Sequence, residues 1–240
     1  MSTLYIIGTP IGNLEDLSYR ATRILGEVDA IACEDTRITR KIYERFQIAS
    51  PAIRFSSHEH NEEHAAKRIV GLLREGRSVA LCTDSGMPGV SDPGYDAVNM
   101  CREAGFNIEL VPGPSAVLGA LVLSGLSGAS FTFKGFPPRK EGRRKRFLEM
   151  DREAPHTLIF FESPYRIAVL LRDALEVLGD REAAVCLELT KQHERVHRGP
   201  LSELCALFEG APHPKGEITL VIAGNNPKFL HTDKDDTVQP

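Results

Sequence analysis

The clearest sign of the fold class is a short apolar run followed at once by a stiff loop: Ser78-Val79-Ala80-Leu81-Cys82 leads into Thr83-Asp84-Ser85-Gly86-Met87-Pro88-Gly89-Val90-Ser91-Asp92-Pro93-Gly94. The run is typical of a buried strand. Loops of this composition at the carboxyl ends of strands line ligand crevices in open α/β sheets. Glycine lets the backbone approach a ligand, and proline keeps the loop stiff.

The same pattern occurs twice more in the first half of the chain. Leu4-Tyr5-Ile6-Ile7 precedes Gly8-Thr9-Pro10-Ile11-Gly12-Asn13, and Ile108-Glu109-Leu110-Val111 precedes Pro112-Gly113-Pro114-Ser115-Ala116. None of the three loops matches the dinucleotide-binding fingerprint or the P-loop. Three such junctions favour a small-molecule site over three unrelated turns.

Strand and helix patterns alternate through the first half, which predicts a mostly parallel sheet with helices on both faces. The second half begins with a buried helix between Pro114 and Gly128. We expect lobes over residues 1–113 and 114–228 and a flexible tail over 229–240. The expected strands are 3–8, 28–33, 52–56, 78–83, 107–111, 130–134, 157–162, 183–189 and 217–223, and the other expected helices are 16–26, 36–46, 60–75, 93–104, 165–178 and 201–209.

Composition places the chain among globular proteins. It has 240 residues, of which 42% are hydrophobic and 26% charged. No apolar run approaches the roughly 18–20 residues of a membrane span, and no signal peptide is visible. The five cysteines lack any C-x-x-C spacing, so we expect reduced thiols in a cytoplasmic protein without a membrane partner.

Basic residues are concentrated in one segment of a chain whose net charge is -4. Lys134 to Arg152 contains eight Lys and Arg against three acids. Such a patch is suited to phosphate groups of a nucleic acid, although a charge run can also be a solvated helix face. A smaller cluster, Lys191 to Arg198, continues the pattern.

Histidines near residue 60 raise the question of a metal site. His60 and His64 are four residues apart, but the metalloprotease pattern H-E-x-x-H is absent. We therefore expect a polar helix start and no metal.

Seven ordered motifs resemble one branch of the tetrapyrrole-methylase superfamily, whose members methylate a cytidine 2′-hydroxyl in 16S ribosomal RNA. The similarity covers residues 3–224. Besides the loop Asp84 to Gly94, the motifs are Gly8-Thr9-Pro10-Ile11-Gly12-Asn13-Leu14-Glu15-Asp16, Cys33-Glu34-Asp35-Thr36-Arg37, Val111-Pro112-Gly113-Pro114-Ser115-Ala116, Phe160-Phe161-Glu162-Ser163-Pro164-Tyr165-Arg166, Glu188-Leu189-Thr190-Lys191 and Gly216-Glu217-Ile218-Thr219-Leu220-Val221-Ile222-Ala223-Gly224.

The resemblance implies a two-lobed α/β fold with a mostly parallel N-terminal sheet and a mixed-sheet C-terminal lobe. It implies a homodimer that binds S-adenosylmethionine between its lobes and 16S rRNA of the small ribosomal subunit as substrate. The implied cofactor contacts are Pro10, Gly86, Met87, Val90, Ser115 and Ala116 in the first lobe and Phe161, Leu189, Gly216 and Ile218 in the second. The implied RNA contacts are Arg139, Lys140, Arg143, Arg144, Lys145 and Arg146.

The central loop departs from the family pattern at two positions, Ser85 and Met87. The family usually has Asp-Ala-Gly-Thr-Pro, whereas this chain has Asp84-Ser85-Gly86-Met87-Pro88. Gly86 and Pro88 are kept, so the backbone shape is expected to be kept. Met87 replaces a hydroxyl with a thioether and removes that side-chain hydrogen bond.

Methyl transfer to a ribose hydroxyl needs in-line geometry and either a base or a cation that favours the alkoxide. The catalytic candidates are Glu34, Asp35, Arg37 and Lys191, with Glu162 and Glu188 as further choices. Asp35 or Thr36 could instead cap the helix 36–46, and Lys191 could be a solvated lysine. No sequence argument selects one base.

Two other functions stay open. The same fold could methylate a tetrapyrrole carbon, although the basic segment speaks against this. A non-catalytic, RNA-binding ribosome-assembly factor is the other alternative, supported only by Met87 and by the lack of a C-terminal segment that many relatives carry.

Overall fold

A computed structural model describes residues 2–231 of the chain. It divides into two compact units, Met1–Ser115 and Ala116–Pro240.

The first unit is built on a five-stranded sheet in which every neighbouring pair is parallel. Its order across the sheet is β3 (Ile53–Ser56), β2 (Ala30–Cys33), β4 (Val79–Cys82), β1 (Thr3–Ile7) and β5 (Asn107–Val111). The three central strands are almost wholly buried, which explains their continuous apolar runs.

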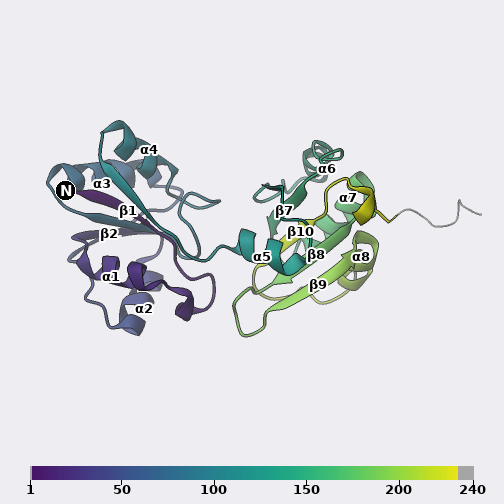
Figure 1. The fold of residues 1–240 in the computed structure, drawn as a ribbon, viewed down its shortest axis with the longest axis horizontal. Helices are drawn as coiled ribbons and strands as arrows, with labels where there is room; N and C mark the ends of the chain where they lie inside the picture. The colour runs from purple at the N-terminus through teal and green to yellow at the C-terminus, as the bar shows by residue number, and fades with distance from the viewer. Residues whose placement is uncertain (1, 232–240) are drawn as a thin grey trace, which may run out of the picture. The chain divides into compact units, whose positions relative to one another are not determined.

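Helices cover both faces of this sheet, as Figure 1 shows. α1 (Tyr19–Glu27) and α2 (Thr36–Phe46) pack on one face, and α3 (Glu62–Arg74) and α4 (Tyr95–Glu103) pack on the other. Local sequence sets two of the helix starts, because the side chains of Ser18 and Asp35 accept hydrogen bonds from the first turns of α1 and α2. A short 3₁₀ helix, η1 (Leu14–Asp16), precedes α1.

The connections after β1 and β4 run in opposite directions. β1 leads through α1 to β2, which lies toward the β3 edge of the sheet. β4 leads through α4, on the opposite face, to β5 at the other edge of the sheet. The adjacent ends of β1 and β4 therefore form the topological switch point of the sheet, where open α/β proteins bind ligands.

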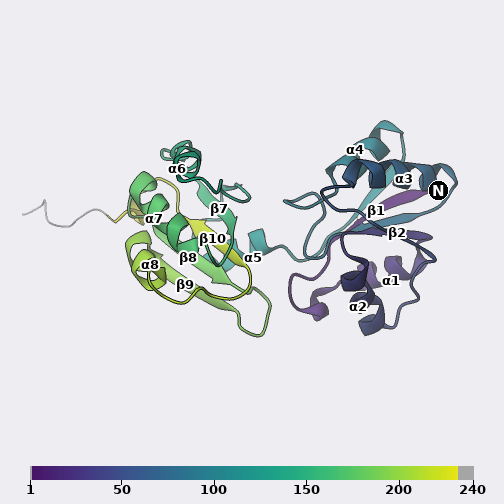
Figure 2. The same ribbon diagram turned by 180° about the vertical axis from the view of Figure 1, so that it is seen from behind.

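The second unit has a mixed five-stranded sheet. Its strands, in order across the sheet, are β6 (Phe131–Phe133), β7 (Thr157–Glu162), β10 (Ile218–Ile222), β8 (Glu182–Leu187) and β9 (Arg195–Pro200). Only the β6–β7 pair is parallel. One face is covered by α5 (Ala116–Ser124), and the other by α6 (Glu141–Glu149), α7 (Ile167–Leu178) and α8 (Leu201–Phe208), as the opposite views of Figure 1 and Figure 2 show.

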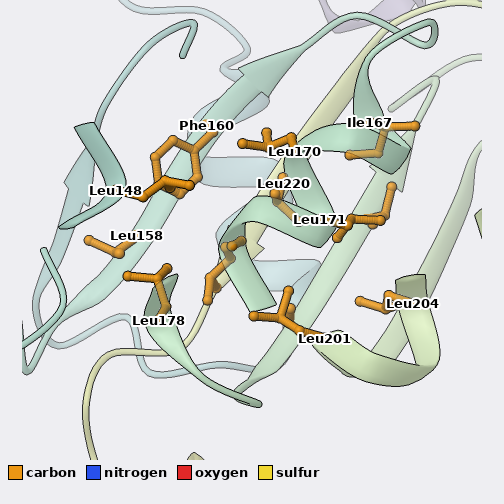
Figure 3. Packing of buried hydrophobic residues seen from close by; sticks show 14 of the residues in the cluster. Leu148, Leu158, Phe160, Ile167, Leu170, Leu171, Leu178, Leu201, Leu204 and Leu220 are labelled. Carbon is orange, nitrogen blue, oxygen red and sulfur yellow. The ribbon is translucent and has the colours of Figure 1, made fainter. Parts of the chain in front are cut away.

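The core of the second unit lies between its sheet and the three helices α6 to α8. Figure 3 shows Phe160 of β7 beside Leu148 of α6, with Leu170 and Leu171 of α7 near Leu220 of β10. All five side chains are fully buried. Each contributes about 1.5–3 kcal/mol relative to an exposed position, so this core holds the surrounding loops on a rigid base.

Two elements differ from the sequence-based expectation. α6 and β9 were expected only as charged stretches. In α6 the buried residues are Arg144 and Leu148, too few apolar positions to produce a helical hydrophobic pattern. β9 is an edge strand whose side chains are exposed or half-buried, so it lacks the apolar content of the central strands.

Residues 229–231, which were expected to belong to a flexible tail, are instead anchored to the second unit. Pro227–Phe229 form a 3₁₀ helix, Leu230 forms a β-bridge with Arg181, and the His231 amide donates to the carbonyl of Asp180 at 2.7 Å. The rest of the expected tail, 232–240, lies outside the described residues. Between residues 2 and 231, no helix has the length and apolar character needed to cross a membrane.

Candidate functional site

The loops after β1 and β4 are joined directly at the switch point. Thr9 and Gly86 form an isolated β-bridge in which each amide donates to the other's carbonyl, at 2.9 and 3.1 Å. Thr9 Oγ1 also donates to the carbonyl of Thr83 at 3.1 Å. These bonds hold two of the three stiff loops in one arrangement, so their remaining backbone groups are positioned before any ligand binds.

The loops after β1 and β5 approach each other so closely that only glycine fits. A Cβ on Gly113 would lie 2.6 Å from the carbonyl oxygen of Gly8, and a Cβ on Gly8 would lie 2.5 Å from Sδ of Met87. The Met87 side chain therefore lies across Gly8, at the end of β1. Its thioether replaces the usual hydroxyl with an apolar contact, and the Gly86-Pro88 backbone keeps the loop shape.

The loop from β4 to α4 is braced from within and by α3. Gly86, Gly89 and Gly94 have φ of +83°, +81° and +147°, which glycine adopts without strain. The Gly89 amide donates to the Pro93 carbonyl at 3.1 Å. Oε1 of Glu62 accepts the amide of Gly94 at 2.7 Å, so the loop has little freedom to collapse.

One buried polar atom at this edge has no partner. Thr83 Oγ1, at the end of β4, forms no hydrogen bond within residues 2–231, and its residue is 2% exposed. Such an atom costs folding free energy unless a ligand or water satisfies it. A polar group of a bound ligand can satisfy it at this position.

Three carboxylates follow β2 and β4 at the same edge. The Asp35 amide donates to Oδ1 of Asp84 at 2.9 Å, and the Asp84 amide donates to Oε2 of Glu34 at 3.3 Å. The loops are thus cross-linked through their own acidic side chains. The resulting negative charge suits a cationic ligand such as a sulfonium.

Asp35 is committed to local structure. Its carboxylate caps α2 through the Arg37 amide at 2.8 Å and pairs with the Arg37 guanidinium at 2.6 Å. Hydrogen bonds from the Arg37 side chain and backbone lower the pKa of Asp35 to about 2. A carboxylate of such low basicity is a poor proton acceptor.

Asp84 has the opposite electrostatic environment. Burial raises its pKa, and the negative charges of Glu34 and Asp35 raise it further, against a lowering hydrogen bond from the Asp35 amide. A raised pKa makes a carboxylate a better base near neutral pH. Of the Asp35–Asp84 pair, Asp84 is the one whose environment suits proton transfer.

The second unit has its own cluster at the edge where β7 and β8 end and β10 begins. Glu188, with φ +50°, receives the amide of Glu217 at 3.0 Å and Nζ of Lys191 at 2.8 Å, both on Oε1. A Cβ on Gly216 would lie 1.8 Å from that same oxygen. Gly216 is therefore required for the Glu188 side chain to lie where it does.

Lys191 is paired and remains cationic. Besides Glu188, its Nζ donates to Oε2 of Glu217 at 3.1 Å. Burial lowers the pKa of Lys191, but the hydrogen bonds that its ammonium group donates to these two carboxylates outweigh burial and raise it. The pKa of Glu188 is lowered, because the Lys191 and Glu217 hydrogen bonds exceed the raising effect of burial. Lys191 can thus supply positive charge but cannot serve as a base at neutral pH.

Glu162 is unavailable as a base. Its side chain is 0% exposed, Oε2 lies 3.1 Å from Arg166 Nη2, and Oε1 accepts the Ser163 amide at 2.7 Å. Burial raises its pKa despite these contacts. Arg166 also donates to the carbonyl of Pro137 at 2.9 Å, so the pair positions the loop after β6.

The cofactor residues expected from the resemblance fall into two sets, one in each unit. Pro10, Gly86, Met87, Val90 and Ser115 lie in the loops after β1, β4 and β5. Ala116 begins α5, and Phe161, Leu189 and Gly216 lie at the edge of the second sheet. Ile218 differs, because its side chain is 3% exposed within the hydrophobic core, so only its backbone can reach a ligand.

Arg144 is buried, whereas the expectation placed it among the residues that contact RNA. Its side chain is 5% exposed, and its Nε lies 2.7 Å from Oδ2 of Asp173, itself 4% exposed. Nη1 donates to the carbonyl of Arg139 at 2.8 Å. The helical period turns this one arginine of α6 inward, where it holds α6, α7 and the preceding loop together.

Lys145 is also held by neighbouring acids, at 3.0 Å from Glu141 and 2.7 Å from Glu176. The other four basic residues expected to contact RNA are exposed: Arg139, Lys140, Arg143 and Arg146.

An aromatic cluster beside this basic surface was missed from sequence. Phe136 is 60% exposed, and its ring centroid lies 5.5 Å from that of Phe161, which in turn lies 4.8 Å from Phe133. Tyr165, 74% exposed, contacts the ring of His213 at 5.2 Å. A signal was present, because Phe136 stands among Lys134, Arg139 and Lys140, and aromatic residues within a basic segment are typical of single-stranded RNA binding.

Metal-binding side chains are not gathered anywhere in the described chain. No group of three or more His, Cys, Asp or Glu among residues 2–231 has an arrangement that could hold an ion. His58 and His60 contact each other edge to face, with ring centroids 6.1 Å apart.

Comparison with known proteins gives a consistent result. The model of the tetrapyrrole (corrin/porphyrin) methylases matches residues 3–205. A protein of Thermotoga maritima called ribosomal RNA small subunit methyltransferase I is 45% identical over 224 residues, 93% of this chain and 99% of its own length. The protein of the same name from Halalkalibacterium halodurans is 46% identical over 226 residues, 94% of this chain and 77% of its own length.

Solved structures show the same fold at lower identity. A diphthine synthase superposes with a TM-score of 0.69 and 17% identity, covering 96% of this chain and 92% of its own. Uroporphyrin-III C-methyltransferase from Thermus thermophilus superposes with a TM-score of 0.63 and 23% identity, covering 93% of this chain and 94% of its own.

Proposed function

The chain belongs to the tetrapyrrole (corrin/porphyrin) methylase family, and from this we propose that it transfers a methyl group from S-adenosylmethionine to the 2′-hydroxyl of a cytidine in 16S rRNA of the small ribosomal subunit. The observation that carries the proposal is the 45% identity to the Thermotoga maritima protein over nearly the full length of both chains. The exposed basic and aromatic surface around α6 supports a nucleic acid substrate.

The residues at the first edge fit the proposed cofactor. Its adenosine and amino-acid parts need hydrogen-bonding groups, which the braced loops after β1 and β4 offer from the backbone at low entropic cost. Thr83 Oγ1 is a buried polar atom with no hydrogen-bond partner within residues 2–231, so a polar group of the cofactor can satisfy it. The carboxylates of Glu34 and Asp84 favour a positive charge nearby. When bound, S-adenosylmethionine supplies an electrophilic methyl group.

We assign proton removal from the acceptor hydroxyl to Asp84. Its raised pKa and half-buried position suit this task, whereas Asp35 is fixed by Arg37 and Glu162 is enclosed. Glu34 holds the Asp84 loop through the Asp84 amide. General base catalysis of this kind contributes about 10²–10⁴-fold.

We assign an electrostatic role to Lys191. Its retained positive charge can stabilise a developing alkoxide or bind an RNA phosphate. Glu188 and Glu217 keep the ammonium group in one place.

RNA would be bound by the exposed residues of the basic segment, Arg139, Lys140, Arg143 and Arg146. Phe136, supported by Phe161, offers a ring face on which an unpaired base can stack. The braced loop after β6 keeps this face rigid.

We further propose a cytoplasmic homodimer. α5 is apolar on all sides, and its Leu118 and Val122 are 53% and 78% exposed. A second copy would cover such side chains. Light scattering of the wild type and of Val122→Asp tests this, and a monomeric wild type contradicts it.

One experiment separates the proposed function from its alternatives. The protein is incubated with labelled S-adenosylmethionine and with unmethylated 30S subunits, naked 16S RNA or a tetrapyrrole precursor. Label on a cytidine ribose supports the proposal. Label on the tetrapyrrole alone contradicts it, and cofactor binding without transfer to any acceptor favours an assembly factor.

A further inference from the structure

The first unit contains a cavity of about 300 Å³ between α2 and the strands β2 and β3. It is lined by three guanidinium groups, those of Arg37, Arg40 and Arg54, and by four hydroxyls, those of Thr36, Thr39, Tyr43 and Ser50. The Arg37 guanidinium is already paired with Asp35, which leaves Arg40 and Arg54 for an anion. Guanidinium groups combined with hydroxyl donors are the donor set that proteins use for phosphate.

The charge around this cavity is opposite to that of its surroundings. The segment 36–54 has five basic residues and one acidic residue, whereas residues 1–115 together have 12 basic and 16 acidic residues. The cavity lining itself contains three arginines and no acidic residue, so the field at the cavity is positive within a unit of net charge -4. The segment was not recognised from sequence because its basic residues are spread over a helix and a strand.

Arg54 is the arginine best placed to receive an anion. It lies on the edge strand β3, and its Nη1 donates to Ser50 Oγ at 3.3 Å. Within residues 2–231 it forms no ion pair with a carboxylate. In the part of the chain that the structure describes, Arg40 forms an ion pair only with Glu44, at 3.2 Å. Their side chains are 70% and 65% exposed, so the pair has little strength.

The cavity adjoins the candidate catalytic edge. Cys33 and Arg37 line it, and the next residues, Glu34 and Asp35, are those that bond to the Asp84 loop. An anion held by Arg40 and Arg54 would therefore lie close to Glu34 and Asp35, whose hydrogen bonds connect them to Asp84.

We propose that this cavity binds a backbone phosphate of the RNA substrate, close to the nucleotide that is methylated. This inference rests on the proposed function, which supplies the RNA. A free phosphate ion has the same chemistry, and the experiment distinguishes the two sources. The role of this phosphate contact is to position the acceptor ribose, separately from the basic surface of α6.

The test compares Arg40→Gln, Arg54→Gln and the double variant with Arg45→Gln. Arg45 is on the same helix but outside the cavity, where it lies 4.0 Å from Glu15. Binding of an unmethylated 16S RNA fragment is measured by fluorescence anisotropy over a range of salt concentrations. S-adenosylmethionine binding is measured by calorimetry, and folding by thermal unfolding.

Each lost phosphate contact reduces the slope of log K against log salt concentration by about 1. We expect a reduction of about 1 to 2 in the double variant, with RNA affinity at low salt lowered about tenfold or more. Arg45→Gln should keep the wild-type slope, and all variants should keep the cofactor affinity. Arg54→Lys keeps the positive charge but not the planar guanidinium group. Its RNA affinity should lie between that of the wild type and that of Arg54→Gln.

Equal slopes for the double variant and Arg45→Gln would overturn the proposal. So would a free-ion site, seen if inorganic phosphate binds the wild type and the double variant loses that binding without any change in RNA affinity. RNA binding with the expected slope loss, in a protein that methylates no RNA, would contradict the proposed function and leave the phosphate site standing.

Discussion

Thr9 and Gly86 exchange two backbone hydrogen bonds, 2.9 and 3.1 Å long, across the switch point of the first sheet. Each stands in a loop that leads to a different face of the sheet. The bridge therefore prevents the two loops from separating, and it fixes the backbone that we propose for cofactor binding.

Gly86→Ala should weaken S-adenosylmethionine binding more than it weakens folding. The φ of +83° is unfavourable for alanine by about 1–2 kcal/mol, and relief of this strain would shift the bridge to Thr9. Gly76→Ala is a matched control, because Gly76 has φ +85° and open space around its Cβ position but lies after α3. Calorimetry should show a loss of cofactor affinity only for Gly86→Ala, while both variants lose similar unfolding free energy. Equal cofactor affinity in the two variants would contradict the role of the bridge.

Asp84→Asn should lower kcat by about 10²–10⁴-fold with little change in cofactor affinity. The asparagine oxygen can still accept the Asp35 amide, so the loop contact is kept. Asp35→Ala should instead lower the free energy of unfolding through the lost cap of α2 and leave most of the activity. Single-turnover methyl transfer and thermal unfolding measure the two effects. An active Asp84→Asn enzyme would exclude Asp84 as the base.

The difference in stability between the Asp84→Asn variant and the wild type should also change with pH in a defined direction. In the folded state, burial raises the pKa of Asp84 above its ordinary value of 3.8. At pH values between the pKa of Asp84 in the unfolded chain and its pKa in the folded protein, the folded protein therefore binds more protons. Asp84 thus makes the protein less stable as pH rises through that range. The variant lacks this dependence, so its relative stability should increase from acidic to neutral pH in denaturant titrations.

Arg144→Ala should destabilise the second unit by about 3–5 kcal/mol, because it leaves Asp173 buried without its partner. The double variant Arg143→Gln/Arg146→Gln should fold normally and bind RNA with a salt slope lower by about 1 to 2. Arg102→Gln, on the exposed surface of α4, controls for a loss of charge elsewhere. Denaturant unfolding and RNA anisotropy separate the two roles. A stable Arg144→Ala protein with weak RNA binding would restore Arg144 as an RNA contact.

Gly216→Ala should disconnect Glu188 from Lys191, since the new Cβ would meet Oε1 of Glu188. We expect Gly216→Ala to lower the rate of methyl transfer. Adding Lys191→Met to this variant should cause no further loss, because the two residues then act through one interaction. Gly210→Ala is the control, with φ +71° and open space at Cβ. Additive losses in the double variant would show that Gly216 acts independently of Lys191.

The same substitution should change the pH dependence of stability. The pKa of Glu188 is lowered from 4.5 in the folded protein. Its stabilising contribution is therefore present above the unfolded pKa and is lost as pH falls through the folded value. Relative to Gly210→Ala, the stability deficit of Gly216→Ala should be present at neutral pH and shrink in acid.

Much of the architecture was predictable because it depends on local patterns. Short apolar runs between stiff loops predicted the strands β1, β4 and β5, and buried parallel strands require such runs. α6 and β9 were missed for the same reason, since a helix that buries an arginine and an edge strand that buries little leave no apolar periodicity.

Residue order determined the fold class, the loops at the carboxyl edges and the location of the basic segment, because strand burial, turn geometry and charge density are properties of neighbouring residues. The tertiary structure decided which like residues differ in role. It buried Arg144 against Asp173 but left Arg143 exposed, raised the pKa of Asp84 through burial, and brought Arg54 of β3 under α2. These differences arise from burial and from contacts between distant segments, and spacing along the chain does not encode either one.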